Sequence, residues 1–501
     1  MKKRLVKSCV ALISATVLSI LPVLAFAGTE EYSYTYNYDY WGDIQDTPDL
    51  YSVSRVFTSS DLKLDVNMKN PGGLYAHGDS LYIIDSGNNR IIETHFVNAQ
   101  ELEVVRIIDS FSGATPDTFS NPTDMAIAEN GDIFIADNGN ARIIKLDKDL
   151  NFLLQFDQPV DNTLDPNATF QPKKLVIDSA ERVYAIATGI NKGLIKYEPD
   201  ATFSGFVGAT PVSYNFLDFL WKKFATQAQR ARLESFVPTE YDNIYMDNEG
   251  FIYAVTSAIK EEDLREDKGD PVRKINLMGN DILIRNGDYS IIGDIYFGEG
   301  GGYSGNSLFS DITVLDNDVY VCLDRNRGRA FGYDDQGKLV FAFGGNGNMD
   351  GYFRRPVGIE HLGNELFILD ELDCAVTMFV PTEFGQRVYE AMEYFDEGRY
   401  DESGEAWEDV MKLDGNYDLA YIGIGRSLLR QKRYGEAMEY FELKYDAENY
   451  SKAYKQYRKE WVEDNIVIIV IVILAVFLIP MGIGKVRSIK REIDTADIFK
   501  V

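Results

Sequence analysis

Six segments of the chain share one pattern, and this repetition limits the fold more than any other feature. Each has a short apolar strand, a turn at Gly, Asp or Asn, and an alternating strand that ends near Asp. Two period-two runs joined by such a turn predict a β-hairpin. The segments begin at Asn70, Asn121, Gln171, Val237, Leu308 and Arg355. Because one such sheet cannot bury both faces alone, the pattern predicts an all-β six-bladed propeller over residues 51–385, with residues 51–57 completing the last blade.

Two of the segments carry a complete polar motif after their second strand. It reads DSGNNR from Asp85 and DNGNAR from Asp137, and DRNRGR from Asp324 keeps the Asp and the Arg. An Asp that accepts backbone amides in a Gly-containing turn, clamped by an Arg, explains this corner without a ligand. With this motif the segments resemble NHL repeats over residues 51–385, although the third, fourth and sixth lack it. NHL propellers include enzymes, protein-binding modules and RNA-binding modules, so the resemblance implies a fold and does not choose a function.

The connection between the fifth and sixth segments is rich in glycine. It reads FGGNGNMDGYFRRPVGI over residues 343–359, and a similar connection occupies residues 111–122. Its glycines let the chain cross from one blade to the next, so we interpret it first as a corner. Its polar residues are expected on one rim of the propeller, as candidates for binding a ligand or partner: Asn346, Asn348, Asp350 and Arg354.

Acidic residues recur near the starts of the expected inner strands. Asp124, Asp242 and Asp311 could ring one mouth of the central channel, where their oxygens would suit Ca²⁺, and no other cofactor is expected. The alternative is that they accept hydrogen bonds from inner-strand amides. The chain has 3 His, and His77 and His361 fall at hairpin turns, away from the strand starts expected to line the channel. A three-histidine zinc site is therefore not expected.

A Tyr-rich segment at residues 28–50 precedes the propeller. Its tyrosines alternate over residues 32–40, so in a strand they would line one face. Tyr34, Tyr36 and Tyr38 could there stack on sugar rings. The alternative is an edge strand whose tyrosines pack against the propeller wall.

Two parts of the chain show helical spacing. An apolar stripe predicts a helix at residues 215–236, packed on the propeller. After the propeller, GRYDESGEAW at residues 398–407 aligns with KRYGEAMEYF at residues 432–441, a spacing of 34. This resembles two tetratricopeptide repeats, which implies a small all-α domain over residues 386–462. Such repeats usually offer a groove to a protein partner, and the alternative is a rigid stalk.

Both ends of the chain carry signals for export or membrane insertion. Basic residues, an apolar run and an A-x-A site predict a signal peptide at residues 1–27. Residues 466–484 are apolar and uncharged, long enough to span a bilayer core of roughly 30 Å, and a basic tail follows at residues 485–501. We expect a single-pass type I protein of the cell membrane with its large domain outside. The net charge of −29 argues against nucleic acid as a partner.

These features favour a non-enzymatic, membrane-anchored extracellular binding or scaffold protein. The layout resembles bacterial NHL–tetratricopeptide membrane proteins associated with carbohydrate ABC transporters, which implies a transporter complex or a carbohydrate as partner. The alternative is a metal-dependent enzyme of the gluconolactonase or lyase type that uses channel carboxylates. Cys322 and Cys374 lie in adjacent segments and could form a disulfide or remain two free thiols.

Overall fold

The computed structural model describes residues 35–161, 164, 169–208, 240–300 and 303–498. The expected signal peptide, Tyr34 and the helix expected at residues 215–236 lie outside these residues. The chain divides into two compact units after Gly385.

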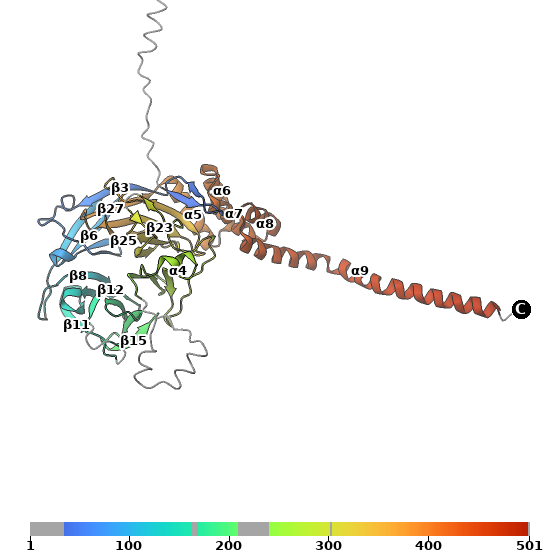
Figure 1. The fold of residues 1–501 in the computed structure, drawn as a ribbon, viewed down its shortest axis with the longest axis horizontal. Helices are drawn as coiled ribbons and strands as arrows, with labels where there is room; N and C mark the ends of the chain where they lie inside the picture. Colours follow the sequence, from blue (N-terminus) through green and yellow to red (C-terminus); the bar gives the residue numbers. More distant parts are fainter. Residues whose placement is uncertain (1–34, 162–163, 165–168, 209–239, 301–302, 499–501) are drawn as a thin grey trace, which may run out of the picture. The chain divides into compact units, whose positions relative to one another are not determined.

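The first unit is a six-bladed β-propeller, as the repeats predicted (Figure 1). The six innermost strands neighbour one another in chain order, and the last lies beside the first, so the ring is closed. The blades, from the innermost strand outward, are β4 (Gly73–His77), β5 (Ser80–Asp85), β6 (Arg90–Asn98) and β7 (Glu101–Ile108); β8 (Pro122–Ile127), β9 (Ile133–Asp137), β10 (Arg142–Leu146) and β11 (Phe152–Phe156); β12 (Gln171–Ile177), β13 (Val183–Thr188), β14 (Leu194–Tyr197) and β15 (Phe203–Val207); β16 (Asn243–Met246), β17 (Ile252–Val255) and β18 (Val272–Ile275); β21 (Phe309–Val314), β22 (Tyr320–Asp324), β23 (Arg329–Tyr333) and β24 (Leu339–Gly344); and β25 (Pro356–Leu362), β26 (Glu365–Asp370), β27 (Ala375–Pro381) and β3 (Tyr51–Thr58).

Blade 4 departs from the four-stranded pattern within the described residues. Its sheet has three strands, and only an isolated bridge between Ile275 and Asp281 extends it outward. Short elements occupy the neighbouring connections: α4 (Glu261–Arg265), β19 (Glu299–Gly300) and β20 (Tyr303–Ser304).

The N-terminal strand β3 closes the ring, as expected for residues 51–57. It pairs antiparallel with β27 from Ala375↔Thr58 to Pro381↔Tyr51, so the outermost strand of blade 6 comes from the start of the chain. Phe57 is buried in one core cluster with residues of blades 1 and 6. Joining the two ends of the repeat array removes the free edge at which an open array would fray.

The predicted corner motif has the structural role that its residues indicated. In blade 2, Asp137 is wholly buried, and its carboxylate accepts hydrogen bonds from Ser120 N at 2.8 Å and Asn140 Nδ2 at 2.8 Å. Arg142 Nε lies 2.9 Å from the same carboxylate. Blade 1 repeats these contacts around Asp85, and a single turn of 3-10 helix follows the Asp in each blade: η1 (Ser86–Asn88) and η2 (Asn138–Asn140).

The Tyr-rich segment extends the sheet of blade 5. Its strands β1 (Tyr36–Tyr38) and β2 (Ile44–Asp46) add to the outer edge of β24. The hydroxyls of Tyr36 and Tyr38 donate to Asp294, which also pairs with Arg329. Tyr36 is buried, so for these two tyrosines the structure agrees with packing against the propeller wall.

The second unit is helical. It comprises α5 (Glu383–Asp396), α6 (Tyr400–Leu413), α7 (Asp418–Arg430), α8 (Tyr434–Leu443) and α9 (Ala447–Ile498). The aligned tyrosines Tyr400 and Tyr434 begin α6 and α8. A Cβ on Gly423 of α7 would lie 2.4 Å from the Trp407 indole, so the missing side chain lets α6 pack closely against α7.

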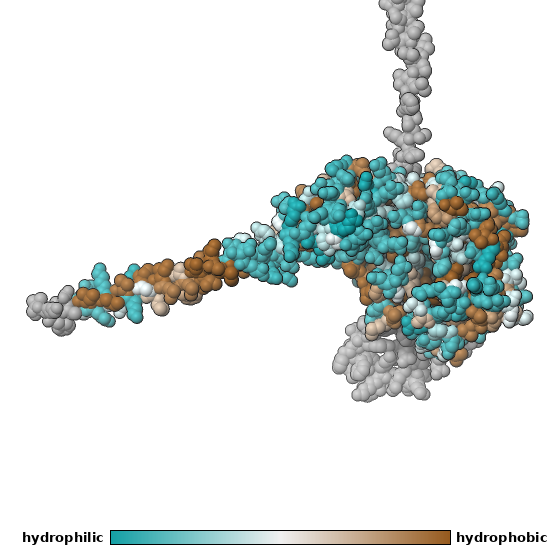
Figure 2. All heavy atoms as spheres, turned by 180° about the vertical axis from the view of Figure 1, so that it is seen from behind, coloured by the Kyte–Doolittle hydropathy of each residue, from teal (hydrophilic) through white to brown (hydrophobic). Residues whose placement is uncertain are grey.

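Helix α9 contains the apolar residues 466–484. Among the described helices, α9 is the one that is long and apolar enough to cross a membrane. Its apolar stretch is not buried against the rest of the chain. Figure 2 shows this stretch as a hydrophobic band between hydrophilic ends of the helix. These features are consistent with a membrane anchor.

We predict that Asp137→Ala destabilises the propeller by about 3–5 kcal/mol, because Arg142 is left buried without its carboxylate. Near-UV circular dichroism of the full chain in detergent would report a lowered thermal midpoint. Asp109→Ala, at an exposed position in the connection between β7 and β8, is the control. Equal midpoints for the two variants would contradict the clamp.

Candidate functional site

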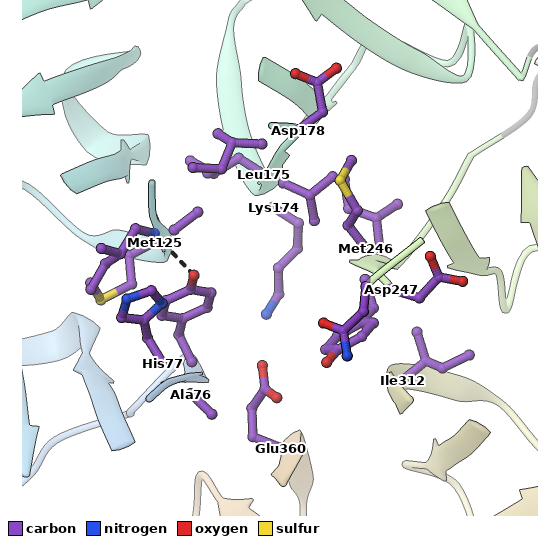
Figure 3. A pocket seen from close by; sticks show the side chains of 18 of the residues that line it. Ala76, His77, Met125, Lys174, Leu175, Asp178, Met246, Asp247, Ile312 and Glu360 are labelled. Atoms are coloured by element: carbon purple, nitrogen blue, oxygen red, sulfur yellow. Dashed lines mark hydrogen bonds between the residues drawn. The ribbon is translucent and has the colours of Figure 1, made fainter. Parts of the chain in front are cut away.

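The inner strands of all six blades surround a central cavity of about 680 Å³. It is lined by the inner strands and by the hairpin turns that follow them, such as residues 178–182 and 247–251. The cavity therefore includes the hairpin end of the channel, the end at which the inner strands finish. Figure 3 shows side chains from different blades converging on this space.

One register position of the inner strands carries polar side chains in four blades. In each blade the residue at this position pairs with the equivalent residue of the second strand. The six residues are Gly73, Asp124, Lys174, Asn243, Asp311 and Gly358. Asp124 accepts the Leu175 N–H of the next blade at 2.8 Å, and Asp311 accepts the Ile359 N–H at 2.8 Å. The alternative role expected for these two aspartates, hydrogen bonding to inner-strand amides, is confirmed.

Lys174 is a buried cation in the middle of these carboxylates. Its Nζ lies 3.4 Å from Asp124, and a Cβ added to Gly73 would be 3.2 Å from Nζ, so the side chain reaches toward blade 1. Burial lowers the pKa of Lys174, but Asp124, Asp311 and Glu360 together outweigh it and leave the pKa raised. Lys174 is therefore a charged ammonium at neutral pH.

Glu360 points into the cavity from β25, opposite Lys174 (Figure 3). Burial, and then the nearby Asp311, raise the pKa of Glu360 well above its ordinary value. Burial also raises the pKa of Asp311 to about 6. Two acids with raised pKa values beside a buried ammonium are the kind of titratable cluster found at functional sites.

Aromatic residues flank this pair on two opposite blades. Tyr75 of blade 1 and Tyr245 of blade 4 line the cavity at the same register position. The Tyr75 hydroxyl accepts a hydrogen bond from Ile127 N at 3.0 Å, and the Tyr75 ring stacks with His77 at 6.5 Å. Tyr245 lies 6.2 Å from the His361 ring.

The expectation that His77 and His361 lie away from the channel is wrong. Both line the cavity, because the inner strands run far enough for their ends and turns to form its wall. His361 Nδ1 lies 2.7 Å from Thr313 Oγ1, and burial lowers the pKa of His361, which favours a neutral ring.

The placement of Asp242 also differs from the sequence prediction. Asn243, one residue later, occupies the register position of Asp124 and Asp311. Asp242 instead accepts hydrogen bonds from the Ser257 amide at 2.6 Å and hydroxyl at 2.7 Å. The Asp242 carboxylate is thus bonded to Ser257, just before β16 begins, and does not occupy the register position that Asp124 and Asp311 share.

The four rim candidates lie in the loop that precedes β25, at the opposite end of this strand from the hairpin turns. Asn348 and Asp350 are exposed, and Arg354 pairs with Asp373 at 2.9 Å. Asn346 Nδ2 donates to Asn326 O at 2.9 Å. A Cβ on Gly345 would lie 2.8 Å from the Tyr352 ring, which supports the interpretation of this loop as a corner.

The residues present do not form an evident metal site. Among the described residues, no three His, Cys, Asp or Glu side chains are grouped so that they could hold a metal ion. Asp124 and Asp311 instead surround the Lys174 ammonium. We therefore derive no step that uses Ca²⁺. Cys322 and Cys374 are free thiols.

Sequence reasoning missed Lys174 and Glu360, although a signal for both was present. When the segments are aligned on their prolines, QPKKLVI places Lys174 beside Asp124 of NPTDMAI, and RPVGIEH places Glu360 two positions further on. Repetition gives no signal for either residue, because each occurs in only one blade.

Comparison with known proteins supports the fold. Residues 119–146, most of blade 2, match the NHL repeat family. No curated protein sequence matches the chain. Similar solved structures include a catalytically inactive virginiamycin B lyase from Staphylococcus aureus with quinupristin, at 13% identity, covering 62% of this chain and 80% of that one, with a TM-score of 0.37.

Two further structures come from Bacteroides thetaiotaomicron. A protein of unknown function is 11% identical, covering 66% of this chain and 75% of that one, with a TM-score of 0.40. The extracellular domain of a putative one-component system is 11% identical, covering 68% of this chain and 38% of that one, with a TM-score of 0.35. At these identities the likeness concerns the fold alone. The chain thus contains an NHL repeat within a six-bladed propeller.

We predict that Glu360→Gln raises the stability of the propeller at neutral pH. The folded-state pKa of Glu360 lies above its ordinary value near 4.5, so the folded chain holds a proton that the unfolded chain releases. The free energy of unfolding of the wild type therefore falls as pH rises from about 4.5 through the raised pKa. Glu360→Gln has no carboxyl proton at this position, so its stability does not show this fall.

Thermal midpoints across pH would test this, with a shift of roughly 2–4 °C for each kcal/mol in a domain of this kind. Glu103→Gln, on an exposed outer strand, is the control. A Glu360→Gln midpoint below that of the wild type at neutral pH would contradict it.

Proposed function

We propose that the protein is a membrane-anchored binding protein whose propeller holds a small polar ligand in the central cavity. The observation that carries the proposal is the buried Lys174 and Glu360, which face each other across a cavity of about 680 Å³. Replacing buried ions by apolar residues of similar size is often neutral or stabilising. A channel that only stabilised the fold would therefore not need this charged pair. A channel that binds a ligand with hydrogen-bond donors and acceptors would need it.

Geometry favours binding over the alternative metal-dependent chemistry of a gluconolactonase or lyase. Such chemistry would use channel carboxylates as metal ligands, but Asp124 and Asp311 are engaged by backbone amides and by Lys174. The ligand class suggested by the sequence resemblance is carbohydrate, and the many hydrogen-bonding groups of the cavity suit a hydroxylated molecule.

In this proposal, the two ends of the chain determine where in the cell the binding site lies. The signal peptide at residues 1–27 would export the propeller, and α9 would anchor it in the membrane. The propeller and its cavity would then lie outside the cell. The helices α6, α7 and α8 would act as tetratricopeptide repeats and dock a membrane-protein partner such as a transporter. Gly423 of α7 packs against Trp407 of α6, and Gly425 of α7 packs against Phe441 of α8, which supports this repeat-like packing.

We predict that a ligand protects the hairpin end of the cavity from chemical labelling. His77→Cys, made in the full chain with Cys374→Ser, places a thiol at a mouth residue. The low-molecular-weight fraction of an extract of the host cells should slow its reaction with a maleimide. Asn348→Cys, on the exposed loop at the other end of β25, should react at an unchanged rate. Protection of Asn348→Cys alone would assign binding to the loop rim and refute the cavity.

We also predict that residues 387–460 are needed for capture of the membrane partner. In-cell crosslinking of the full chain should recover a membrane protein that is lost when these residues are deleted and the remainder of α9, residues 461–498, is kept. Recovery of the same partner from the deleted chain, with equal amounts of protein in the membrane, would refute docking by the helices.

A further inference from the structure

The charge of the cavity identifies the kind of ligand more narrowly. Its lining includes eight carboxylates, and Lys174 and Arg182 are the basic residues among the residues that line it. Arg182 pairs with Asp178 at 2.6 Å and Lys274 pairs with Asp247 at 3.2 Å, so these two carboxylates are balanced, and the negative excess comes from the other six carboxylates set against Lys174. Three of the eight, Glu129, Glu249 and Asp316, lie in the hairpin turns and are exposed at the mouth. A cleft lined by one sign of charge concentrates ligands of the opposite sign.

A metal ion is not the cation that this arrangement suits best. Divalent ions need several oxygens that converge on one point, and the described residues provide no such group. An organic ammonium needs only one carboxylate and can use aromatic faces for the rest of its shell. Glu360 provides the carboxylate, and Tyr75 and Tyr245, which line the same cavity and interact electrostatically with Glu360, provide the aromatic faces.

Glu360 has an unfilled capacity to bind. It is 8% exposed and points into the cavity (Figure 3). Its side chain contacts Thr313 Oγ1 at 3.4 Å and is hydrogen-bonded by the His361 backbone amide. A carboxylate can accept about four hydrogen bonds, so part of the accepting capacity of Glu360 stays open to the cavity.

From this geometry we infer that the ligand carries a protonated primary amine, as an amino sugar or a polyamine does, and that its ammonium group binds to Glu360 between Tyr75 and Tyr245. The inference rests on the proposed function and names the ligand chemistry of the same cavity. Lys174 lies opposite Glu360 in the cavity (Figure 3), where Asp124 and Asp311 balance its charge, so it can donate to a hydroxyl of the same ligand.

Binding of an amine should be coupled to proton release from Glu360. The groups that act on Glu360 are Lys174 of β12, Asp311 of β21 and Asp124 of β8, and Glu360 in turn acts on Tyr75 of β4 and Tyr245 of β16. His361 of β25 is its neighbour in sequence. An arriving ammonium favours the ionised carboxylate, so amine affinity should rise with pH until Glu360 is ionised in the free protein.

Protection of His77→Cys in the full chain provides the test. Acetic anhydride converts the primary amines of the low-molecular-weight extract to neutral amides. We expect the treated extract to lose its protection, and spermidine or glucosamine to protect where glucose does not. Protection that survives acetylation, or equal protection by glucose and glucosamine, would overturn the amine and leave the proposed binding function standing. Absence of protection by the extract, spermidine and glucosamine alike would overturn both.

A variant pair separates the carboxylate from the fold. Glu360→Gln keeps the size and polarity of the side chain and should weaken protection by the amine probe by about tenfold or more, because a charge-assisted bond is lost. It should also remove the rise of affinity with pH. Glu103→Gln, on the exposed outer strand β7, should behave as the wild type. A Glu360→Gln chain that folds and retains both affinity and pH dependence would overturn the role of Glu360.

Discussion

The pairing of β3 with β27 is the interaction on which the rest of the structure depends. Each blade alone has an inner edge that no neighbour covers, and an open array would leave two blades with exposed faces. The outermost strand of blade 6 is β3, which comes from the N-terminal side of the repeats, and its pairing with β27 closes the ring. Closure in turn brings the six inner strands around one axis, and only then do Lys174 of blade 3 and Glu360 of blade 6 face each other.

The ring also explains how buried charges are tolerated at its centre. Asp124 and Asp311 sit where the inner strand of the next blade presents an amide, so each carboxylate gains a backbone donor from across a blade interface. Hydrogen bonds to charged groups contribute more than those between neutral groups, which offsets part of the desolvation cost. These aspartates thus join neighbouring blades and also hold the Lys174 ammonium in place.

The sequence predicted the fold well because the fold is repetitive. A hairpin signal that recurs six times is read more reliably than any one strand, and the Asp and Arg of the corner motif sit in contact, as their spacing indicated. The site was predicted less well for the same reason. Asp124, Asp242 and Asp311 all lie near the start of an expected inner strand, but a shift of one residue moves the Asp242 side chain to the other face of its strand.

Glu360 and Lys174 could not be assigned from repetition, because function here resides in the positions where the blades differ. Gly73 has no side chain, which leaves room for the Lys174 amine near blade 1, and this contact joins residues about a hundred positions apart. Such a cross-ring contact follows from the closure of the propeller and leaves no local pattern. In a radial fold the shared residues therefore define the scaffold, and the unshared residues on the inner strands define what the channel can bind.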